Sequence, residues 1–332
     1  MLSPSTAIVV TTINTPTKAM EMFANGANRS GWRFYVVGDL KTPDASYRDF
    51  AATYLSAQTQ RDSGFPYADL IVDNHYSRKN MGYLQAIAEG VDCIVESDDD
   101  NLPREVFFAP RERTMSQAVV RDAGWVNTYR YYTDMPVWPR GFPLERLKDD
   151  VPPLGDVQVA SALLQQGLAD DDPDVDAIYR LIGELPITFR QDQSVGLVGQ
   201  SWCPFNSQNT TWFSELFPLL YLPSFCSFRM VDIWRSFVTG AVMAANGQPL
   251  VFHKANVWQE RNDHNLLKDF EAEVSGYLKN AIIIDHLKTL DLPVGMDRLG
   301  GAMRLCYEKL VAEDIFPAKE LDLVDAWLAS MR

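Results

Sequence analysis

The sequence predicts an α/β fold in which helices flank a mixed, mostly parallel sheet, followed by a helical C-terminal region. In the first 100 residues, short β-branched apolar runs alternate with segments of helical character. Polar side chains directly follow three of these runs, and the pattern from residue 266 onward is helical. Such alternation is typical of βαβ units that build a parallel sheet.

Four strands are predicted in this first part, at residues 7–13, 32–37, 70–72 and 93–96. Val and Ile favour strands, and a continuous apolar run indicates a strand that is buried on both faces. Helices are predicted from Pro16 to about residue 26, over 47–60 and over 80–89, where Gly90 ends the last one.

The rest of the chain predicts a less regular middle and a helical end. Residues 125–129 are strand-like, and residues 138–143 form a proline-containing loop. Residues 229–247 predict one helix with an apolar face, followed by a strand at 250–252. Helices with breaks at Pro293 and Pro317 follow. We therefore predict an α/β domain over 1–265, which would carry the site, and a helical extension over 266–332.

Composition excludes some classes of function. The chain has 332 residues, 46% of them hydrophobic, and a net charge of −14. No basic surplus is present to bind nucleic acid or an anionic membrane. No apolar run has the length of a membrane span, and the N-terminus lacks the pattern of a signal peptide. Four scattered cysteines do not suggest a disulfide scaffold, so we expect a cytoplasmic protein.

The run Asp98-Asp99-Asp100-Asn101 is the main candidate for chemistry. It follows the strand predicted at 93–96. Adjacent carboxylates repel one another, and a hard divalent cation such as Mn²⁺ or Mg²⁺ relieves that repulsion. Because side chains alternate along a strand, Asp98 and Asp100 are expected to face the metal and Asp99 the opposite side. The alternative is a solvated acidic turn that caps the next segment.

Two other groups of polar residues are expected at the same edge of the sheet. Ligands of open α/β sheets bind beyond the C-terminal ends of the strands. The first group follows two strands and is either part of a nucleotide site or ordinary turn chemistry: Thr11, Thr12, Asn14 and Asp39. The second group is Arg78-Lys79-Asn80. Cations at a helix N-terminus oppose the helix dipole, which suggests a bound anion, although a basic surface turn is the alternative.

Further candidates lie in the second half of the chain. His253, at a strand end, is either a third metal ligand or a structural histidine. Asp232 is either a general base that deprotonates an acceptor hydroxyl or the partner of Arg235 in an exposed i,i+3 ion pair. The polar cluster from Gln259 to His264 is either a binding loop or a connection. No P-loop, GxGxxG or nucleophile elbow is present.

Taken together, several motifs make the chain resemble the glycosyltransferase domain of the STELLO family. The motifs lie between residue 7 and about residue 270. They are Val10-Thr11-Thr12-Ile13-Asn14, Val36-Val37-Gly38-Asp39, Arg78-Lys79-Asn80-Met81-Gly82-Tyr83, Glu96-Ser97-Asp98-Asp99-Asp100-Asn101, Trp138-Pro139-Arg140-Gly141, Pro173-Asp174-Val175-Asp176-Ala177-Ile178, Pro204-Phe205-Asn206-Ser207-Gln208-Asn209-Thr210, Asp232-Ile233-Trp234-Arg235, and Gln259 with Arg261-Asn262. More loosely, the chain is similar to the reversibly glycosylated polypeptides, which are UDP-arabinopyranose mutases. Unlike the membrane-bound STELLO members, it shows no transmembrane anchor, so a Golgi location is not carried over.

Both resemblances imply a GT-A type fold that binds a nucleotide sugar and a divalent metal. They imply a metal-dependent glycosyltransferase of glycan synthesis that uses a nucleotide-diphosphate sugar, UDP-sugar first, and a glycan or other hydroxyl acceptor. Asp98, Asp100 and His253 are then the expected ligands of Mn²⁺ or Mg²⁺. The expected catalytic and sugar-positioning residues are Asp232, Arg235 and Arg140. Donor binding is expected from Thr11, Thr12, Asn14, Asp39, Arg78, Lys79, Asn80 and Asp99.

The sequence leaves two alternatives to a transferase open. One is a nucleotide-sugar mutase that interconverts pyranose and furanose rings, needs no acceptor and could be glycosylated transiently on an arginine. The other is a non-catalytic organiser of glycan-synthesis enzymes, although a scaffold has no need for a diphosphate site. The assembly state is also open, with a homo-oligomer among the alternatives.

Overall fold

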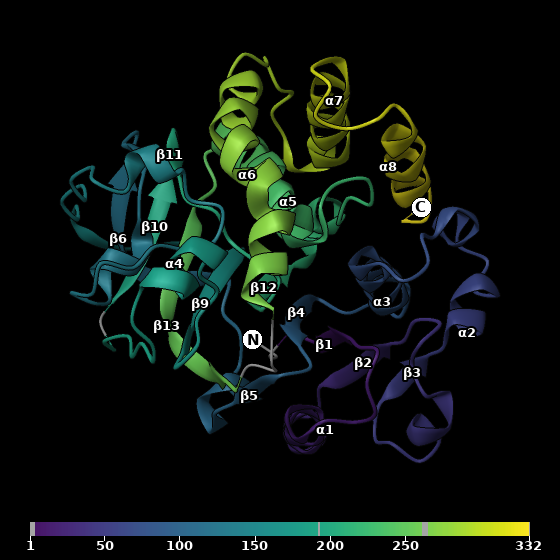
Figure 1. The fold of residues 1–332 in the computed structure, drawn as a ribbon. Helices are drawn as coiled ribbons and strands as arrows, with labels where there is room; N and C mark the ends of the chain where they lie inside the picture. Colours follow the sequence, from purple (N-terminus) through teal and green to yellow (C-terminus); the bar gives the residue numbers. More distant parts are fainter. Residues whose placement is uncertain (1–3, 192, 261–264, 332) are drawn as a thin grey trace.

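The computed structural model describes residues 4–191, 193–260 and 265–331 (Figure 1). Within these ranges the strands are β1 (Thr6–Thr11), β2 (Arg33–Val37), β3 (Thr53–Leu55), β4 (Cys93–Asp98), β5 (Asn101–Pro103), β6 (Thr114–Arg121), β7 (Gly124–Trp125), β8 (Val157–Ser161), β9 (Leu164–Asp170), β10 (Ser194–Val198), β11 (Ser201–Trp202), β12 (Asn209–Phe213) and β13 (Leu250–Gln259). The helices are α1 (Lys18–Ser30), α2 (Ala57–Arg61), α3 (Lys79–Ala88), α4 (Ala177–Ile182), α5 (Val231–Ala245), α6 (Leu266–Leu287), α7 (Leu299–Ala312) and α8 (Lys319–Ala329).

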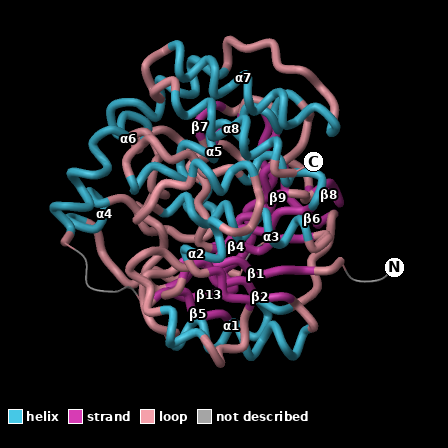
Figure 2. Tube along the Cα trace, turned by 90° about the vertical axis from the view of Figure 1, so that its right-hand side faces the viewer, coloured by secondary structure: helices cyan, strands magenta, loops and turns pink. Residues whose placement is uncertain are grey.

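One large mixed sheet runs through the molecule (Figure 2). In the described residues its strand order is β3-β2-β1-β4-β12-β9-β13-β10-β6-β8, and β5 pairs with β13 at the side. The strands β3, β2, β1 and β4 are parallel to one another, whereas β12 pairs antiparallel with β4 and β9. The prediction of a mixed sheet flanked by helices is therefore confirmed.

Strand β1 is buried on both faces, as its continuous apolar run predicts. Its alternate residues enter two different core clusters: Ile8 and Val10 pack on the α1 side, and Val9 packs on the α3 side. Helix α3 approaches β1 closely at Gly82, where an added Cβ would lie 2.6 Å from both Val9 and Val37. The two helix layers hold the polar C-terminal ends of β1, β2 and β4 at one edge of the sheet.

Two predicted elements of the N-terminal half are wrong. The helix predicted over 47–60 is replaced by a short 3₁₀ turn, the strand β3 and the short helix α2. The strand predicted at 70–72 is absent from this described segment, where a 3₁₀ turn (Pro66–Leu70) leads into a bend. β3 extends the parallel sheet beyond β2, and this long-range pairing outweighs the local helical preference.

The helical C-terminal region is confirmed. Helix α6 ends at Leu287, before Pro293, and α7 ends before Pro317. Trp327 of α8 is fully buried and contacts the rings of Tyr67 and Tyr221. The boundary at residue 265 stays a prediction, because residues on both sides of it belong to one core cluster. In the part of the chain that the structure describes, no helix combines the length and the hydropathy needed to span a bilayer.

Candidate functional site

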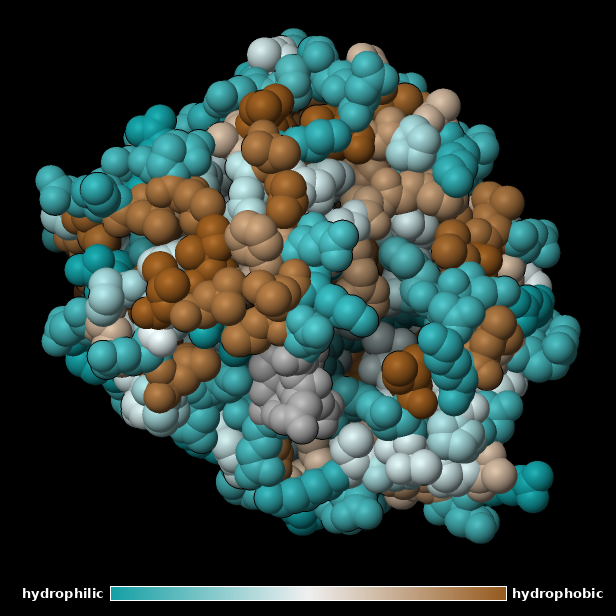
Figure 3. Space-filling view, in the orientation of Figure 1, coloured by the Kyte–Doolittle hydropathy of each residue, from teal (hydrophilic) through white to brown (hydrophobic). Residues whose placement is uncertain are grey.

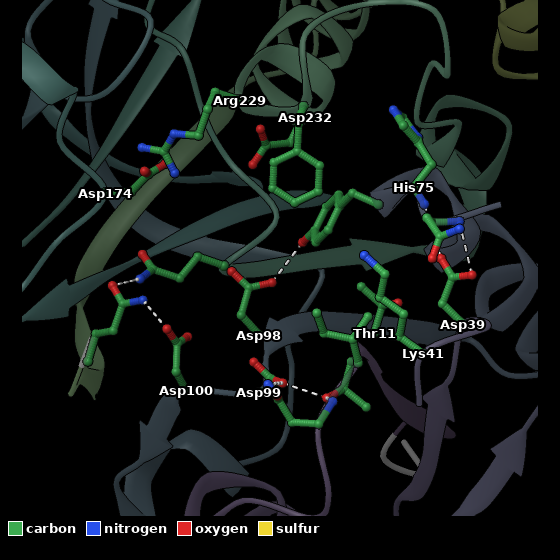
Figure 4. A pocket seen from close by; sticks show the side chains of 18 of the residues that line it. Thr11, Asp39, Lys41, His75, Asp98, Asp99, Asp100, Asp174, Arg229 and Asp232 are labelled. Carbon is green, nitrogen blue, oxygen red and sulfur yellow. Dashed lines mark hydrogen bonds between the residues drawn. The ribbon is translucent and has the colours of Figure 1, made fainter. Parts of the chain in front are cut away.

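A cavity of about 390 Å³ opens at the C-terminal edge of β1, β2 and β4 (Figure 4). Its walls include the end of β1 and the residues after it, with Thr11, Thr12 and Asn14, and the three aspartates of the predicted acidic run. Further lining residues come from the segment that follows β2, from the segment that precedes α4 and from the start of α5. The three predicted polar strand ends therefore meet at one cavity.

Asp98 is held from behind by a tyrosine and a lysine. Tyr76 donates a hydrogen bond to its carboxylate at 2.7 Å, and Lys79 Nζ lies 3.2 Å from the same oxygen. Burial raises the pKa of Asp98, while the Lys79 charge opposes that effect. A divalent cation would stabilise the ionised carboxylate in this partly buried position.

Strand alternation does not set the directions of Asp99 and Asp100, because β4 ends at Asp98 and both residues lie in the turn before β5. All three aspartates line the cavity, but their partners differ. Asp99 accepts hydrogen bonds from the Thr12 hydroxyl at 2.5 Å and from the Asn14 amide at 3.0 Å. Asp100 accepts from the Gln259 amide at 2.9 Å. Asp99 therefore joins the acidic turn to the residues after β1. Asp98 is held from the segment before α3, and Asp100 is held from the end of β13.

Asp39 lies two residues after the end of β2 and lines the cavity, but its carboxylate is already bound by groups of the protein. It accepts from the backbone amides of Asn74 and His75, both at 3.0 Å. Arg78, which is fully buried, pairs with it at an N–O distance of 2.9 Å and also pairs with Asp73. The cations at the start of α3 suggested a bound anion. For Arg78 the anions are carboxylates of the protein itself, those of Asp39 and Asp73.

Lys79 and Asn80 lie behind the cavity instead of lining it. Lys79 is fully buried and donates to the backbone oxygens of Ser97 at 2.6 Å and Ser207 at 3.1 Å, besides its contact with Asp98. Asn80 donates to the Leu222 carbonyl at 2.9 Å and so ties α3 to the segment before α5. The structure places these residues, like Arg78, in positions that support the cavity wall.

Arg140 joins two carboxylates on the opposite side of the cavity. Its guanidinium makes paired hydrogen bonds to Asp174 at 2.8 and 2.9 Å and to Asp232 at 3.0 Å each. Ser207 also donates its backbone N–H to Asp232 at 3.1 Å. Burial alone raises the pKa of Asp232, but the Arg140 charge and its hydrogen bonds outweigh burial and hold that pKa at about 2.

This geometry bears directly on the role expected for Asp232. A general base works best when its pKa lies near the operating pH, and the Arg140 guanidinium holds the pKa of Asp232 below its usual range, which makes this carboxylate a weaker base. Asp232 therefore suits hydrogen bonding to a substrate hydroxyl better than removal of its proton.

The loop that carries Arg140 is fixed by Asp176, the N-cap of α4. Asp176 accepts from the Tyr179 backbone N–H at 2.8 Å and from the Trp138 indole at 2.7 Å. Gly141 follows Arg140 with a φ of +88°, and a Cβ there would lie 2.4 Å from Ile233 of α5. Only glycine meets both requirements, so the loop can approach α5 closely enough for Arg140 to reach Asp232.

Asp176 should make the stability of the protein depend on pH in a specific window. Burial raises its pKa to about 6. A carboxyl group with a raised folded-state pKa binds more protons when folded, so the free energy of unfolding should fall as pH rises from about 4 to about 6. We expect Asp176→Asn to remove about 2–3 kcal/mol of this decrease, measured by urea denaturation at several pH values. Asp156→Asn, at an exposed position, is the matched control and should keep the wild-type slope.

Arg235 and His253 are not brought to the cavity. Arg235 is buried against Glu96 at 2.7 Å, with the rings of Phe205 and Trp212 nearby. His253 lies opposite Gly167 in the β9–β13 pairing, six residues before Gln259. Six residues of strand correspond to roughly 20 Å, so His253 is too far along β13 to share a cation with Asp98 and Asp100. Burial lowers its pKa to about 4.

The described residues contain no group of three His, Cys, Asp or Glu side chains arranged to hold a metal ion. A metal at this edge would therefore depend on ligands from its substrate in addition to protein carboxylates. The cavity itself is acidic among its described lining residues. The acids are Asp39, Asp98, Asp99, Asp100, Asp174 and Asp232, and the cations are Lys41, Arg140 and Arg229. A diphosphate would be repelled here without a cation of its own.

Several cavity residues were not identified from the sequence. Tyr76, Lys41 and Phe228 line it, and Phe228 is 58% exposed with its ring packed edge-on against Tyr76. No local pattern marks them, because each lies on a loop or turn whose position depends on distant segments. Within the expected polar cluster after β13, Gln259 does line the cavity, whereas residues 261–264 lie outside the described residues.

Comparison with known proteins supports the resemblance carried by the motifs. Residues 229–332 match the model of the STELLO glycosyltransferases. The chain is similar to the STELLO glycosyltransferases. Probable glycosyltransferase STELLO2 of Arabidopsis thaliana is 26% identical over 257 residues, and probable glycosyltransferase STELLO1 is 27% identical over 252 residues. The STELLO similarity covers 69% of this chain but only 32% of each plant protein, so the chain spans about a third of these relatives.

Solved structures of another enzyme have a weaker likeness. Glucosyl-3-phosphoglycerate synthase from Mycobacterium tuberculosis, in complex with Mn²⁺, UDP-glucose and phosphoglyceric acid, has a TM-score of 0.45 and 12% identity. That match covers 83% of this chain and 79% of the enzyme. A complex of the same enzyme with UDP has a TM-score of 0.43 and 11% identity, with coverages of 83% and 80%.

Proposed function

We propose that this chain is a metal-dependent glycosyltransferase of GT-A type that takes its sugar from a nucleotide-diphosphate donor. The observation that carries the proposal is the meeting of three polar strand ends, including Asp98 and Asp100, at one cavity of about 390 Å³. Ligands of open α/β sheets bind at this edge. The STELLO similarity supports the same class of reaction.

In this proposal, Asp98 and Asp100 hold Mn²⁺ or Mg²⁺. Their oxygens are the hard donors that these ions prefer, and the excess of carboxylates in the cavity favours a cation. When bound, the metal supplies neutralisation of the charge on the leaving diphosphate. His253 is not part of the proposed ligand set, because β13 places it away from the two aspartates.

The other residues of the cavity bind and orient the two substrates. The end of β1, with Thr11, Thr12 and Asn14, faces the nucleotide, and UDP is the first nucleotide to test. Asp39, fixed by Arg78, shapes the same wall. On the opposite side Asp232 accepts hydrogen bonds from hydroxyl groups and Arg140 holds its carboxylate in position, while Tyr76 and Lys79 hold Asp98 in place.

A thermal-shift experiment tests the proposed donor site. A ligand at a hundred times its Kd stabilises the folded state by about 2.7 kcal/mol, which raises the Tm of a chain this long by roughly 2–4 °C. We expect that rise with UDP plus Mn²⁺, and a much smaller one with UDP plus chelator or with uridine plus Mn²⁺. The absence of a shift with every nucleoside diphosphate in Mn²⁺ would overturn the proposal.

A further inference from the structure

Helix α6 carries an apolar stripe on its exposed face. At 100° per residue, the five stripe positions fall within about 120° of one another around the helix and run for roughly 22 Å along it. Their exposed fractions range from 37% to 70%. The stripe consists of Leu267, Phe270, Val274, Leu278 and Ile282. The opposite face of the same helix is buried, with Ile283, Ile284 and Leu287 in the core.

Helix α4 extends this apolar surface. Its Leu181 is 45% exposed and its Ile182 is 77% exposed. Figure 3 shows brown, hydrophobic surface gathered over α4 and along α6. Together these seven residues expose on the order of 700 Å², which exceeds the largest patch of a typical monomer and is close to one partner's share of a standard interface. An area of this size is what a stable dimer requires.

We propose that the α6 stripe is a self-association surface on which a second copy of this chain packs antiparallel. Antiparallel packing about a two-fold axis near Val274 and Ser275 places Leu267 of one copy opposite Ile282 of the other. In that register the dipoles of the two helices point in opposite directions, which is the favourable arrangement for neighbouring helices. Both stripes are then covered along their full length.

In this register, charged side chains near the stripe of one copy lie beside side chains of opposite charge on the other copy. On α6, Glu271 lies at the edge of the stripe sector, about 40° from Leu267, and Lys268 and Lys279 lie on the flank next to it, at about 100° and 120°. With the axis between residues 274 and 275, Glu271 of one copy lies beside Lys279 of the other. The chain's net charge of −14 and the mixed signs on this flank do not suit an anionic membrane surface. A second copy therefore fits the stripe better than a lipid surface does.

Sedimentation velocity over a concentration series at about 0.15 M salt tests the dimer, since this ionic strength screens the repulsion between two acidic copies. We expect wild-type protein to form a dimer and Leu278→Glu to weaken it at least tenfold, while the exposed side chain leaves the Tm unchanged. Val159→Glu, on the edge strand β8 at a 75% exposed position, is the matched control and should leave the dimer intact. A monomer at all concentrations, or a dimer that survives Leu278→Glu, would overturn the proposal.

Cysteine crosslinking tests the antiparallel register. A residue near the two-fold axis meets its own copy, so Val274→Cys should form a disulfide-linked dimer under mild oxidation. Leu267→Cys should not, because antiparallel packing separates its two copies by roughly 22 Å. Wild-type protein sets the background from the native cysteines. Crosslinking through Leu267→Cys but not Val274→Cys would contradict the register.

Discussion

Asp100→Asn is expected to abolish metal-dependent binding of UDP and to lower glycosyl transfer at least a hundredfold. Asparagine keeps the size of the side chain and an acceptor for the Gln259 amide, which lies 2.9 Å from Asp100. It removes one of the two negative charges that we assign to the metal. Calorimetric titration of UDP in the presence of Mn²⁺ measures the binding, and hydrolysis or transfer of a UDP-sugar measures the activity.

Two other aspartates supply controls for this variant. Asp49→Asn, at an exposed position away from the cavity, should bind UDP like the wild type. Asp99→Asn should weaken the turn through Thr12 and Asn14 but keep the response to Mn²⁺, because the Asp99 carboxylate is held by these two side chains and is not assigned to the metal. Full activity of Asp100→Asn, or of wild-type protein in chelator, would show that the metal role is wrong.

Asp98 is a less suitable position for the first test. Lys79 is fully buried beside it, and removing the carboxylate charge leaves that ammonium group with only neutral acceptors. An uncompensated buried charge is strongly destabilising. A loss of activity in Asp98→Asn would then combine a folding effect with the loss of a metal ligand.

Arg235→Met is expected to destabilise the fold by about 3–5 kcal/mol, the range for breaking a buried ion pair. Arg235 is 1% exposed and makes hydrogen bonds of 2.9 and 2.7 Å to the two oxygens of Glu96, which is 0% exposed. Methionine fills similar space but leaves the Glu96 carboxylate without its cation. The free energy of unfolding in urea measures this loss.

The double variant Glu96→Gln with Arg235→Met separates structure from catalysis. Removing both charges should restore most of the lost stability, because no buried charge is then unpaired. If Arg235 acts only within this pair, the double variant should bind UDP with Mn²⁺ like the wild type. A stable double variant that has lost UDP binding would instead support the catalytic role expected from the sequence.

The strands that deliver the site could be predicted because their signals are local. β1, β2 and β4 are continuous apolar runs that end in polar residues, and the structure confirms all three. Parallel pairing then forces their ends to one edge, whatever the rest of the chain does. The helices α1, α3, α5 and α6 were predicted on similar grounds, from caps and helical spacing.

Segments with weak local signals were predicted less well. Residues 53–55 form strand β3 by pairing with the edge of β2, and the sequence of that segment does not by itself predict this pairing. The roles of charged residues depended even more on distant partners. The expected i,i+3 pair between Asp232 and Arg235 does not form, since Arg140 pairs with Asp232 and Glu96 pairs with Arg235.

From its sequence alone, this chain is an α/β protein with an acidic run at the end of a buried strand, because hydrophobic pattern and strand alternation are properties of neighbouring residues. Whether Asp98 and Asp100 face a cavity, and whether Arg78, Lys79 and Arg235 meet a ligand or a carboxylate of the protein, was decided by tertiary contacts. The free energy of a charge depends on burial and on partners that lie, for Glu96 and Arg235, 139 residues apart.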